Sequence, residues 1–402
     1  MKNKFLINSE KLQNSLRLRL NPVRNLNPQS LTRILDNFHQ GHLAAASLMW
    51  EAIERRDDVL QGVISKRKKA ISRLKWEIIT LDNSPEALEH KDALQFFYNN
   101  LTASHACDGN QTGGFPLLVK QMLDSIAKKY AVHEILYQPH SSTQLTASFR
   151  FVPLWFFENT TGKLRLLSPN NSTESSPLTP PYWLITTGDC LMESCSLAYL
   201  YKTLPLRDWL HYCERNGMPG IKGVTDARPG TAQWESALQA VHEFGADFRA
   251  LMDRGSDIQA IDLSSHGDLP YPPLIDRMDR AMVALWRGCD LTTLAKSQAT
   301  GASLQENETS ILEEDDAAMI SETLNAQVDR QVLQQLFKVK RGKAYIQLQP
   351  TRTHRTLQDL ELYRQLCEMG LPMPKSHLYE RFGIPQPSAD NEMCISQSHK
   401  NN

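Results

Sequence analysis

A long helical segment between residues 304 and 338 restricts the fold of this chain more than any other feature. Its apolar side chains recur every four residues, a spacing close to the repeat of an α-helix. These side chains are Ile320, Leu324, Val328, Val332 and Leu336. The pattern predicts one slowly winding apolar stripe along the longest regular helix of the chain.

The segment directly before this helix has a different composition. Residues 291–303 carry one charged side chain, Lys296, among many small residues. Ser303 and Glu306 form an S-x-x-E capping box, which predicts that the long helix begins at about Leu304. A loop of this length inside a compact domain is usually functional or disordered. The loop contains no catalytic or binding motif. Its composition fits a loop that moves and contacts a polymer without binding it tightly, and it also fits a simple connection between two helices.

Charge is distributed unevenly along the chain. The 402 residues have a net charge of −1, so the bulk charge does not favour binding to a polyanion. Residues 1–75 nevertheless contain fifteen Lys or Arg against six Asp or Glu, whereas residues 306–330 contain eight acids and one Arg. This polarity matters more than the sum of the charges.

The cysteines give no sign of a metal site. There are seven, an odd count, with no CxxC, and Cys190 and Cys195 are the only close pair. We therefore predict reduced thiols, no metal and no cofactor. No apolar run approaches the length of a membrane span, and the N-terminal stretch lacks the apolar core of a signal peptide. We therefore expect no membrane partner. We also expect the protein to function or assemble in the compartment where it is made.

Hydrophobic patterns indicate an α+β fold. Residues 1–30 have the composition of a basic arm, and helices are expected from Ser30, over 43–72, over 85–101 and over 115–130. KWEIITL, HEILYQ, ASFRFVPLWFF, KLRLLS and YWLITT are expected as strands.

A different organisation begins near residue 193. Residues 196–217 are expected to be helical, with a kink or restart at Pro205. After a mixed region, residues 272–288 form another helix. Its apolar face should pack against the earlier helix. That face carries Leu274, Met278, Met282 and Leu285, with Ile275, Val283 and Trp286 flanking them.

Motifs of catalysis are missing. There is no Gly-rich phosphate loop, no GxSxG elbow and no HExxH. The acids Glu313, Glu314, Asp315 and Asp316 could hold a cation, but acids are also favourable near the start of a helix. We prefer the second interpretation, and we interpret His133 as a packed or surface histidine.

A basic run, SKRKKAISRLK, covers residues 65–75. Basic side chains at this density can contact phosphates. A solvated helix face, or pairing with an acidic neighbouring subunit, explains the run as well, and we favour that interpretation. Its basic residues are Lys66, Arg67, Lys68, Lys69, Arg73 and Lys75. The RDW at 207–209 is interpreted as an ion pair packed under an indole.

Five segments, taken in order, match the pattern of one family. In chain order they are RRDDVLQGVISKRKKAISRLKWEI (55–78), LPLRDWLHYCERNGMPGIKG (204–223), LWRGCDLTT (285–293), GASLQENETSILEEDDAAMISETLNAQVDRQVLQQLF (301–337) and GLPMPKSHLYERFGIPQP (370–387). With its LRDW…E…G-x-P, Gly-x-x-Leu-Thr-Thr and D-A…L-N segments, the chain resembles the Mu-like phage portal protein family over nearly its whole length.

The resemblance implies an α+β portal fold with a mixed α/β wing, a helical stem, a small α/β clip, a tunnel loop with a long wing helix, and a helical C-terminal crown. It assigns the N-terminal arm and wing to 1–192, the stem helices to 193–217 and 268–290, the clip to 218–267, the tunnel loop to 291–303, the long wing helix to 304–338, and the crown with a flexible tail to 339–402.

The resemblance also implies a structural protein and not an enzyme. The implied assembly is a ring of about a dozen subunits at one capsid vertex, through which DNA enters and leaves. The implied partners are other copies of the chain, double-stranded DNA, the terminase large subunit, major capsid and scaffold proteins, and a head–tail adaptor. The implied location is the virion, after assembly in the cytoplasm of a host bacterium.

A loop that projects into a channel must contact moving DNA without holding it. One lysine per subunit, Lys296, would centre the duplex, and the acids behind it would repel phosphates. The residues expected to line this tunnel are Thr292, Thr293, Lys296, Ser297, Gln298, Thr300, Gly301 and Ser303.

Two other interpretations stay open. The ring could be the connector of a DNA-free, phage-derived particle, which the sequence does not separate from a true portal. The other is a metal-dependent enzyme of nucleic-acid processing that uses residues 313–316 for Mg²⁺, although a third carboxylate element and a nucleophile are missing.

Overall fold

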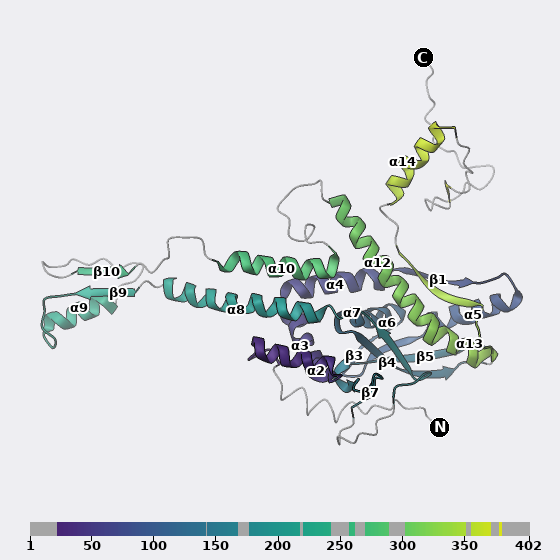
Figure 1. Cartoon of the computed structure of the whole chain (residues 1–402), viewed down its shortest axis with the longest axis horizontal. Helices are drawn as coiled ribbons and strands as arrows, with labels where there is room; N and C mark the ends of the chain where they lie inside the picture. The colour runs from purple at the N-terminus through teal and green to yellow at the C-terminus, as the bar shows by residue number, and fades with distance from the viewer. Residues whose placement is uncertain are drawn as a thin grey trace, which may run out of the picture. The chain divides into compact units, whose positions relative to one another are not determined.

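The structure of the chain is a computed structural model. It describes residues 22–141, 143–167, 177–217, 220–242, 257–261, 270–288, 302–350, 355–370 and 378–379 (Figure 1). The chain forms two compact units, Met1–Gln349 and Pro350–Asn402. The predicted α+β fold is confirmed, since helices of the first unit pack against a five-stranded sheet.

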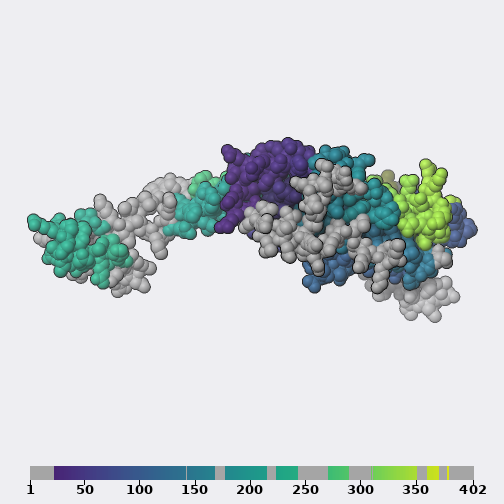
Figure 2. Space-filling view, turned by 90° about the horizontal axis from the view of Figure 1, so that it is seen from below, coloured from purple at the N-terminus to yellow at the C-terminus, as the bar shows by residue number. Residues whose placement is uncertain are grey.

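Three helices open the described part of the chain. α2 (Pro28–His39) begins after Asn27, whose side chain accepts a hydrogen bond from the backbone N–H of Ser30. The stretch expected as one helix forms two, α3 (Leu43–Arg56) and α4 (Asp58–Ser72). Asp57 separates them because its backbone is extended and its carboxylate caps α4, accepting the N–H of Leu60 at 2.8 Å. In Figure 2 these N-terminal helices (purple) form a continuous part of the surface.

The central sheet has the strand order β3-β2-β5-β4-β8. Its strands are β2 (Thr102–His105), β3 (Asp108–Gly113), β4 (Tyr130–Pro139), β5 (Leu145–Val152) and β8 (Trp183–Thr187). All neighbours are antiparallel except β2 and β5. The helices that pack on the sheet are α5 (Pro85–Asn100), α6 (Phe115–Met122) and α7 (Asp124–Lys128). A short pair of β6 (Phe157–Glu158) and β7 (Arg165–Leu166) follows the 3-10 turn η1 (Leu154–Phe156).

A second, two-stranded sheet joins distant parts of the sequence. β1 (Lys75–Thr80) pairs antiparallel with β11 (Ala344–Gln349), and Ile78 lies opposite Ile346. β1 directly follows α4, so this pairing ties the end of the long helical segment back to the N-terminal helices.

Two long helices flank a small separate sheet in the sequence. α8 (Met192–Gly217) contains Pro205 inside one helix. Of the predicted kink or restart at Pro205, the restart therefore does not occur. β9 (Gly220–Val224) pairs antiparallel with β10 (Asp257–Ile261), and α9 (Ala232–His242) contacts β9. α10 (Tyr271–Arg287) then packs against both α8 and α4 and ends at Gly288, whose φ of 71° is a left-handed conformation that glycine adopts readily.

The predicted face of α10 is only partly correct. Met282 is fully buried and Met278 packs against the core, but Leu274 and Leu285 are 39% and 38% exposed. Val283 and Trp286, which the sequence predicts beside this face, are buried as well. The buried stripe is therefore turned toward Val283, because α10 packs against α4 as well as against α8.

The long helix is confirmed, with two differences. It consists of α12 (Ala302–Leu324), a π-helical turn η3 (Asn325–Asp329) and α13 (Arg330–Phe337) (Figure 1). It begins two residues earlier than predicted, so Ser303 lies inside the helix and is not its N-cap. Of the predicted stripe, Ile320, Leu324, Val328 and Val332 are fully buried and Leu336 is half-buried.

The π-helical turn follows from the four-residue spacing. An α-helix has 3.6 residues per turn, so a stripe with this spacing drifts by about 40° at each step. A π turn contains more residues per turn and reverses the drift. The turn therefore keeps Val332 of α13 on the same buried side as Ile320 of α12.

The second unit is described mainly by one helix. Most of the described residues of this unit form α14 (Arg355–Glu368).

Candidate functional site

The predicted tunnel residues fall largely outside the described residues. This applies to Thr292, Thr293, Lys296, Ser297, Gln298, Thr300 and Gly301. Ser303 lies in the first turn of α12. The structure therefore bears on the loop through the two helices that flank it, α10 and α12.

One arginine of α4 binds both flanking helices. The guanidinium of Arg67 donates two hydrogen bonds to the carboxylate of Asp316 in α12, at 2.7 and 2.8 Å. It donates a third, at 3.0 Å, to the backbone carbonyl of Trp286 in α10. The same group lies 5.9 Å from the centre of the Trp286 ring, within range of a cation–π contact. We call these three residues the Arg67 node.

The node is buried and geometrically specific. The side chains of Arg67 and Asp316 retain 8% and 5% of their exposure. Burial raises the pKa of the Asp316 carboxyl, and the hydrogen bonds from Arg67 act in the opposite direction. A two-pronged arginine–carboxylate pair fixes orientation as well as distance. The node therefore fixes the C-terminal end of α10 against α12.

α12 extends well beyond this node. Its first residue is fourteen positions before Asp316, which corresponds to about 21 Å of helix. Ile311, within this extension, is exposed. The segment that begins after Gly288 therefore connects the buried end of α10 to a helix that projects away from it.

The acids of 313–316 do not act together. Asp316 belongs to the node, so its charge is neutralised by Arg67 and does not repel phosphates as the sequence interpretation expects. Glu313 is half-buried, where burial raises its pKa and the charge of Arg287 lowers it. Asp315 is exposed. Within the residues that the structure describes, no group of three or more His, Cys, Asp or Glu is placed to hold a metal.

Helix geometry also divides the basic run. Arg67 and Lys68 point inward, whereas Lys66, Lys69, Arg73 and Lys75 are exposed. Lys68 donates to Asp124 at 2.9 Å, and Lys128 reaches the other oxygen of that carboxylate at the same distance. Burial raises and the two lysines lower the pKa of Asp124, and the net result lies well below its usual range. The solvated-face interpretation holds for the four exposed residues.

A third buried lysine connects the two long helices. The Nζ atom of Lys202 in α8 lies 2.6 Å from Asp279 in α10 and 2.9 Å from the capping residue Asp57. Burial lowers the pKa of Lys202, but the ion pairs with both carboxylates outweigh it and the pKa lies above its ordinary value. Farther along α8, Arg207 and Asp208 are exposed and 3.9 Å apart. They do not form the packed ion pair that the sequence suggested.

The remaining candidate groups are structural. His133 is completely buried, and burial lowers its pKa to about 3, so it is an uncharged core residue. No disulfide joins the five cysteines that lie in the described ranges. No helix in the described part of the chain combines the length and the apolar content that crossing a bilayer requires.

Solved structures with a similar fold come from phage-like particles. A chain from the neck of an empty gene transfer agent particle has a TM-score of 0.57 and 10% identity, covering 84% of this chain and 94% of that chain. A chain from the virion of a native gene transfer agent particle has a TM-score of 0.57 and 9% identity, covering 88% and 94%. The fold is therefore one found in subunits of virion necks.

Sequence comparison defines the family. The model described as "Portal protein of Mu bacteriophage" matches residues 48–384. The Mu-like prophage FluMu protein gp29 of Haemophilus influenzae is 22% identical over 299 residues, covering 70% of this chain and 54% of that protein. The chain thus spans about half the length of this curated relative. It belongs to the family of Mu phage portal proteins, which are structural components of the virion used in DNA packaging and are not enzymes.

Proposed function

We propose that this protein assembles into a closed ring of about twelve subunits at one vertex of a phage capsid. The ring is the channel for DNA packaging and ejection. It also docks the terminase large subunit during packaging and a head–tail adaptor afterwards, and it contacts the major capsid and scaffold proteins. It is assembled in the cytoplasm of the host bacterium.

Family membership and the symmetry of similar assemblies support this proposal. A chain from the neck of a native gene transfer agent particle, computed with C12 symmetry, has a TM-score of 0.54 and 10% identity, covering 90% of this chain and 96% of that chain. A cyclic ring needs head-to-tail interfaces, in which two different surfaces of each subunit meet.

The Arg67 node is the observation that supports a tunnel loop at residues 291–303. It holds the end of α10 rigidly against α12. The first turns of α12 project past this anchor by about 21 Å. A loop carried on such a projection can reach a channel while its supports stay fixed. We propose that Lys296 makes the charged contact with DNA there.

A packaging assay tests the proposal. We expect Lys296→Glu and deletion of residues 297–302 to leave rings intact and to reduce the DNA packaged or retained, because each subunit then repels or fails to guide the duplex. Lys91→Glu, at an exposed lysine of α5, is the matched control and should package normally. Unchanged packaging and infectivity in both loop variants would mean that the loop is only a connector.

A further inference from the structure

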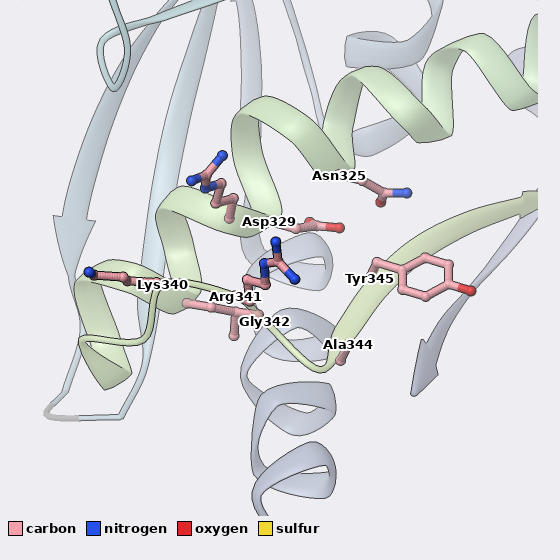
Figure 3. Close-up of a pocket in the computed structure, with 9 residues that line it drawn as sticks. Asn325, Asp329, Lys340, Arg341, Gly342, Ala344 and Tyr345 are labelled. Atoms are coloured by element: carbon pink, nitrogen blue, oxygen red, sulfur yellow. The ribbon is translucent and has the colours of Figure 1, made fainter. Parts of the chain in front are cut away.

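A pocket lies where the π-helical turn and α13 meet the beginning of β11 (Figure 3). Its volume is about 460 Å³. It is lined by Asn325, Asp329, Arg330, Leu333, Lys340, Arg341, Gly342, Ala344 and Tyr345. The pocket is within the range of volumes that bind a peptide side chain or a small ligand.

The rim of this pocket is strongly basic. Residues 330–343 contain five Lys or Arg and no acid. Arg330, Lys340 and Arg341 are exposed, and among the described residues no carboxylate forms an ion pair with any of them. Lys343, by contrast, pairs with Glu86 at 2.8 Å. Three cations without a described counter-ion around one hollow favour an anionic ligand.

The walls of the pocket favour a peptide over a nucleic acid. Leu333 and Tyr345 provide an apolar and an aromatic wall. The Oδ1 atom of Asn325 is buried and accepts no hydrogen bond from the described residues, so it can accept one from a ligand. A phosphodiester backbone offers acceptors only, whereas a peptide offers N–H donors together with its carboxylates.

The position of the pocket also restricts its ligand, and this step rests on the proposed ring. The helix that begins beside the tunnel loop reaches Arg330 after 28 residues, about 42 Å away. The pocket is therefore a separate site from the tunnel loop. In a ring, rotation about the axis relates neighbouring subunits, so equivalent residues keep the same distance from the axis and the same height along it. The acidic start of a neighbouring subunit's α12 therefore meets this basic end only if the helix runs around the ring.

We propose that this pocket is a docking site for an acidic, extended segment of a partner protein. The three cations bind its carboxylates, Asn325 accepts a backbone N–H, and Tyr345 packs against an apolar side chain between the acids. The chain's own C-terminal residues 371–402 are a poor ligand, since they contain three acids and three Lys or Arg.

Fluorescence anisotropy with the full chain tests this site. The probe is a labelled peptide of alternating glutamate and leucine, and the control probe has glutamine in place of glutamate. We expect Arg330→Gln/Lys340→Gln/Arg341→Gln to weaken binding of the acidic peptide about tenfold or more. The matched control, Lys66→Gln/Lys69→Gln/Lys91→Gln, removes three exposed lysines elsewhere and should bind as the wild type does.

A second variant tests the pocket itself. Asn325→Asp adds a negative charge inside it with almost no change in size, and we expect weaker binding of the acidic peptide. Equal affinity of the wild type and the pocket variants would overturn the proposal. So would a labelled DNA duplex that binds more tightly than the peptide and loses affinity in the triple pocket variant. Ring formation is measured in every variant by native mass spectrometry, so loss of the ring is distinguished from loss of the site.

Discussion

At the scale of single residues, buried charges are the points where separate segments are fixed to one another. Arg67 lies 249 positions from Asp316 in the sequence, and both side chains are almost completely buried. Removing one partner of such a pair leaves an uncompensated charge, which is more costly than removing both.

This asymmetry gives a prediction for Arg67. We expect Arg67→Met to lower the free energy of unfolding by about 3–5 kcal/mol, because Asp316 stays buried without its partner. The double variant Arg67→Met/Asp316→Leu should recover most of that loss. Lys69→Met, at an exposed position of the same helix, should change stability by about 0.5 kcal/mol or less. Denaturant unfolding measures all three, and a double variant no better than Arg67→Met would contradict the account.

Asp329 is a buried carboxyl inside the π-helical turn. The hydroxyl of Tyr98 and the backbone N–H of Ile346 both donate hydrogen bonds to it. Burial raises its pKa to about 7, and these hydrogen bonds only partly oppose the shift. Because the folded pKa lies above the unfolded one, the folded state holds the proton more tightly. The stability contributed by this group therefore falls as pH rises from about 4 to about 7.

The effect is measurable with one substitution. Between pH 5.5 and 7.5 the Asp329 carboxyl should lower the free energy of unfolding by about 2 kcal/mol. The Asp329→Asn variant cannot titrate at this position and still accepts a hydrogen bond. Between pH 5.5 and 7.5 its free energy of unfolding should therefore fall by about 2 kcal/mol less than that of the wild type. The comparison of the two proteins cancels the other titrating groups. Identical pH profiles would show that Asp329 is ionised throughout this range.

At the scale of elements, local patterns predicted the regular structure better than its interruptions. The long helix was predicted because its apolar stripe is periodic, and the four-residue spacing contains the signal for a π turn. The capping box at Ser303 was misleading, since the helix continues through it. The break at Asp57 could have been found from its capping side chain, but the apolar periodicity on both sides hides it.

Contacts between elements were not accessible from the sequence. The pairing of Arg67 with Asp316 depends on how α4, α10 and α12 pack, and a helix pattern does not reveal which neighbour a side chain meets. The same limit explains the error on α10. Its apolar residues cover a wide arc, and only packing against α4 and α8 selects Met282, Val283 and Trp286 from that arc.

Two substitutions test the packing of α10, at positions that the sequence predicts on one face of this helix. Met282→Asp buries an unpaired charge and should cost several kcal/mol, with loss of assembly. Leu274→Asp, on the same helix but partly exposed, should be tolerated at a cost of about 0.5 kcal/mol. Thermal unfolding and native mass spectrometry compare the two. Normal rings from Met282→Asp would show that this face of α10 is not packed.

At the scale of the whole molecule, charge is divided between buried ion pairs and exposed basic surfaces. One buried lysine, Lys202, and one buried arginine, Arg67, tie the helices that flank the small sheet and the loop to the N-terminal helices. The exposed basic residues of α4 and of the pocket take no part in these buried contacts.

Electron cryomicroscopy of the purified full chain tests the proposed ring and its tunnel loop together. We predict a closed ring of about twelve subunits with an open central channel, and residues 291–303 at its narrowest part. Monomers or dimers at micromolar concentration and moderate salt would contradict the ring. A ring in which residues 291–303 lie away from the channel would contradict the tunnel assignment and leave the ring intact.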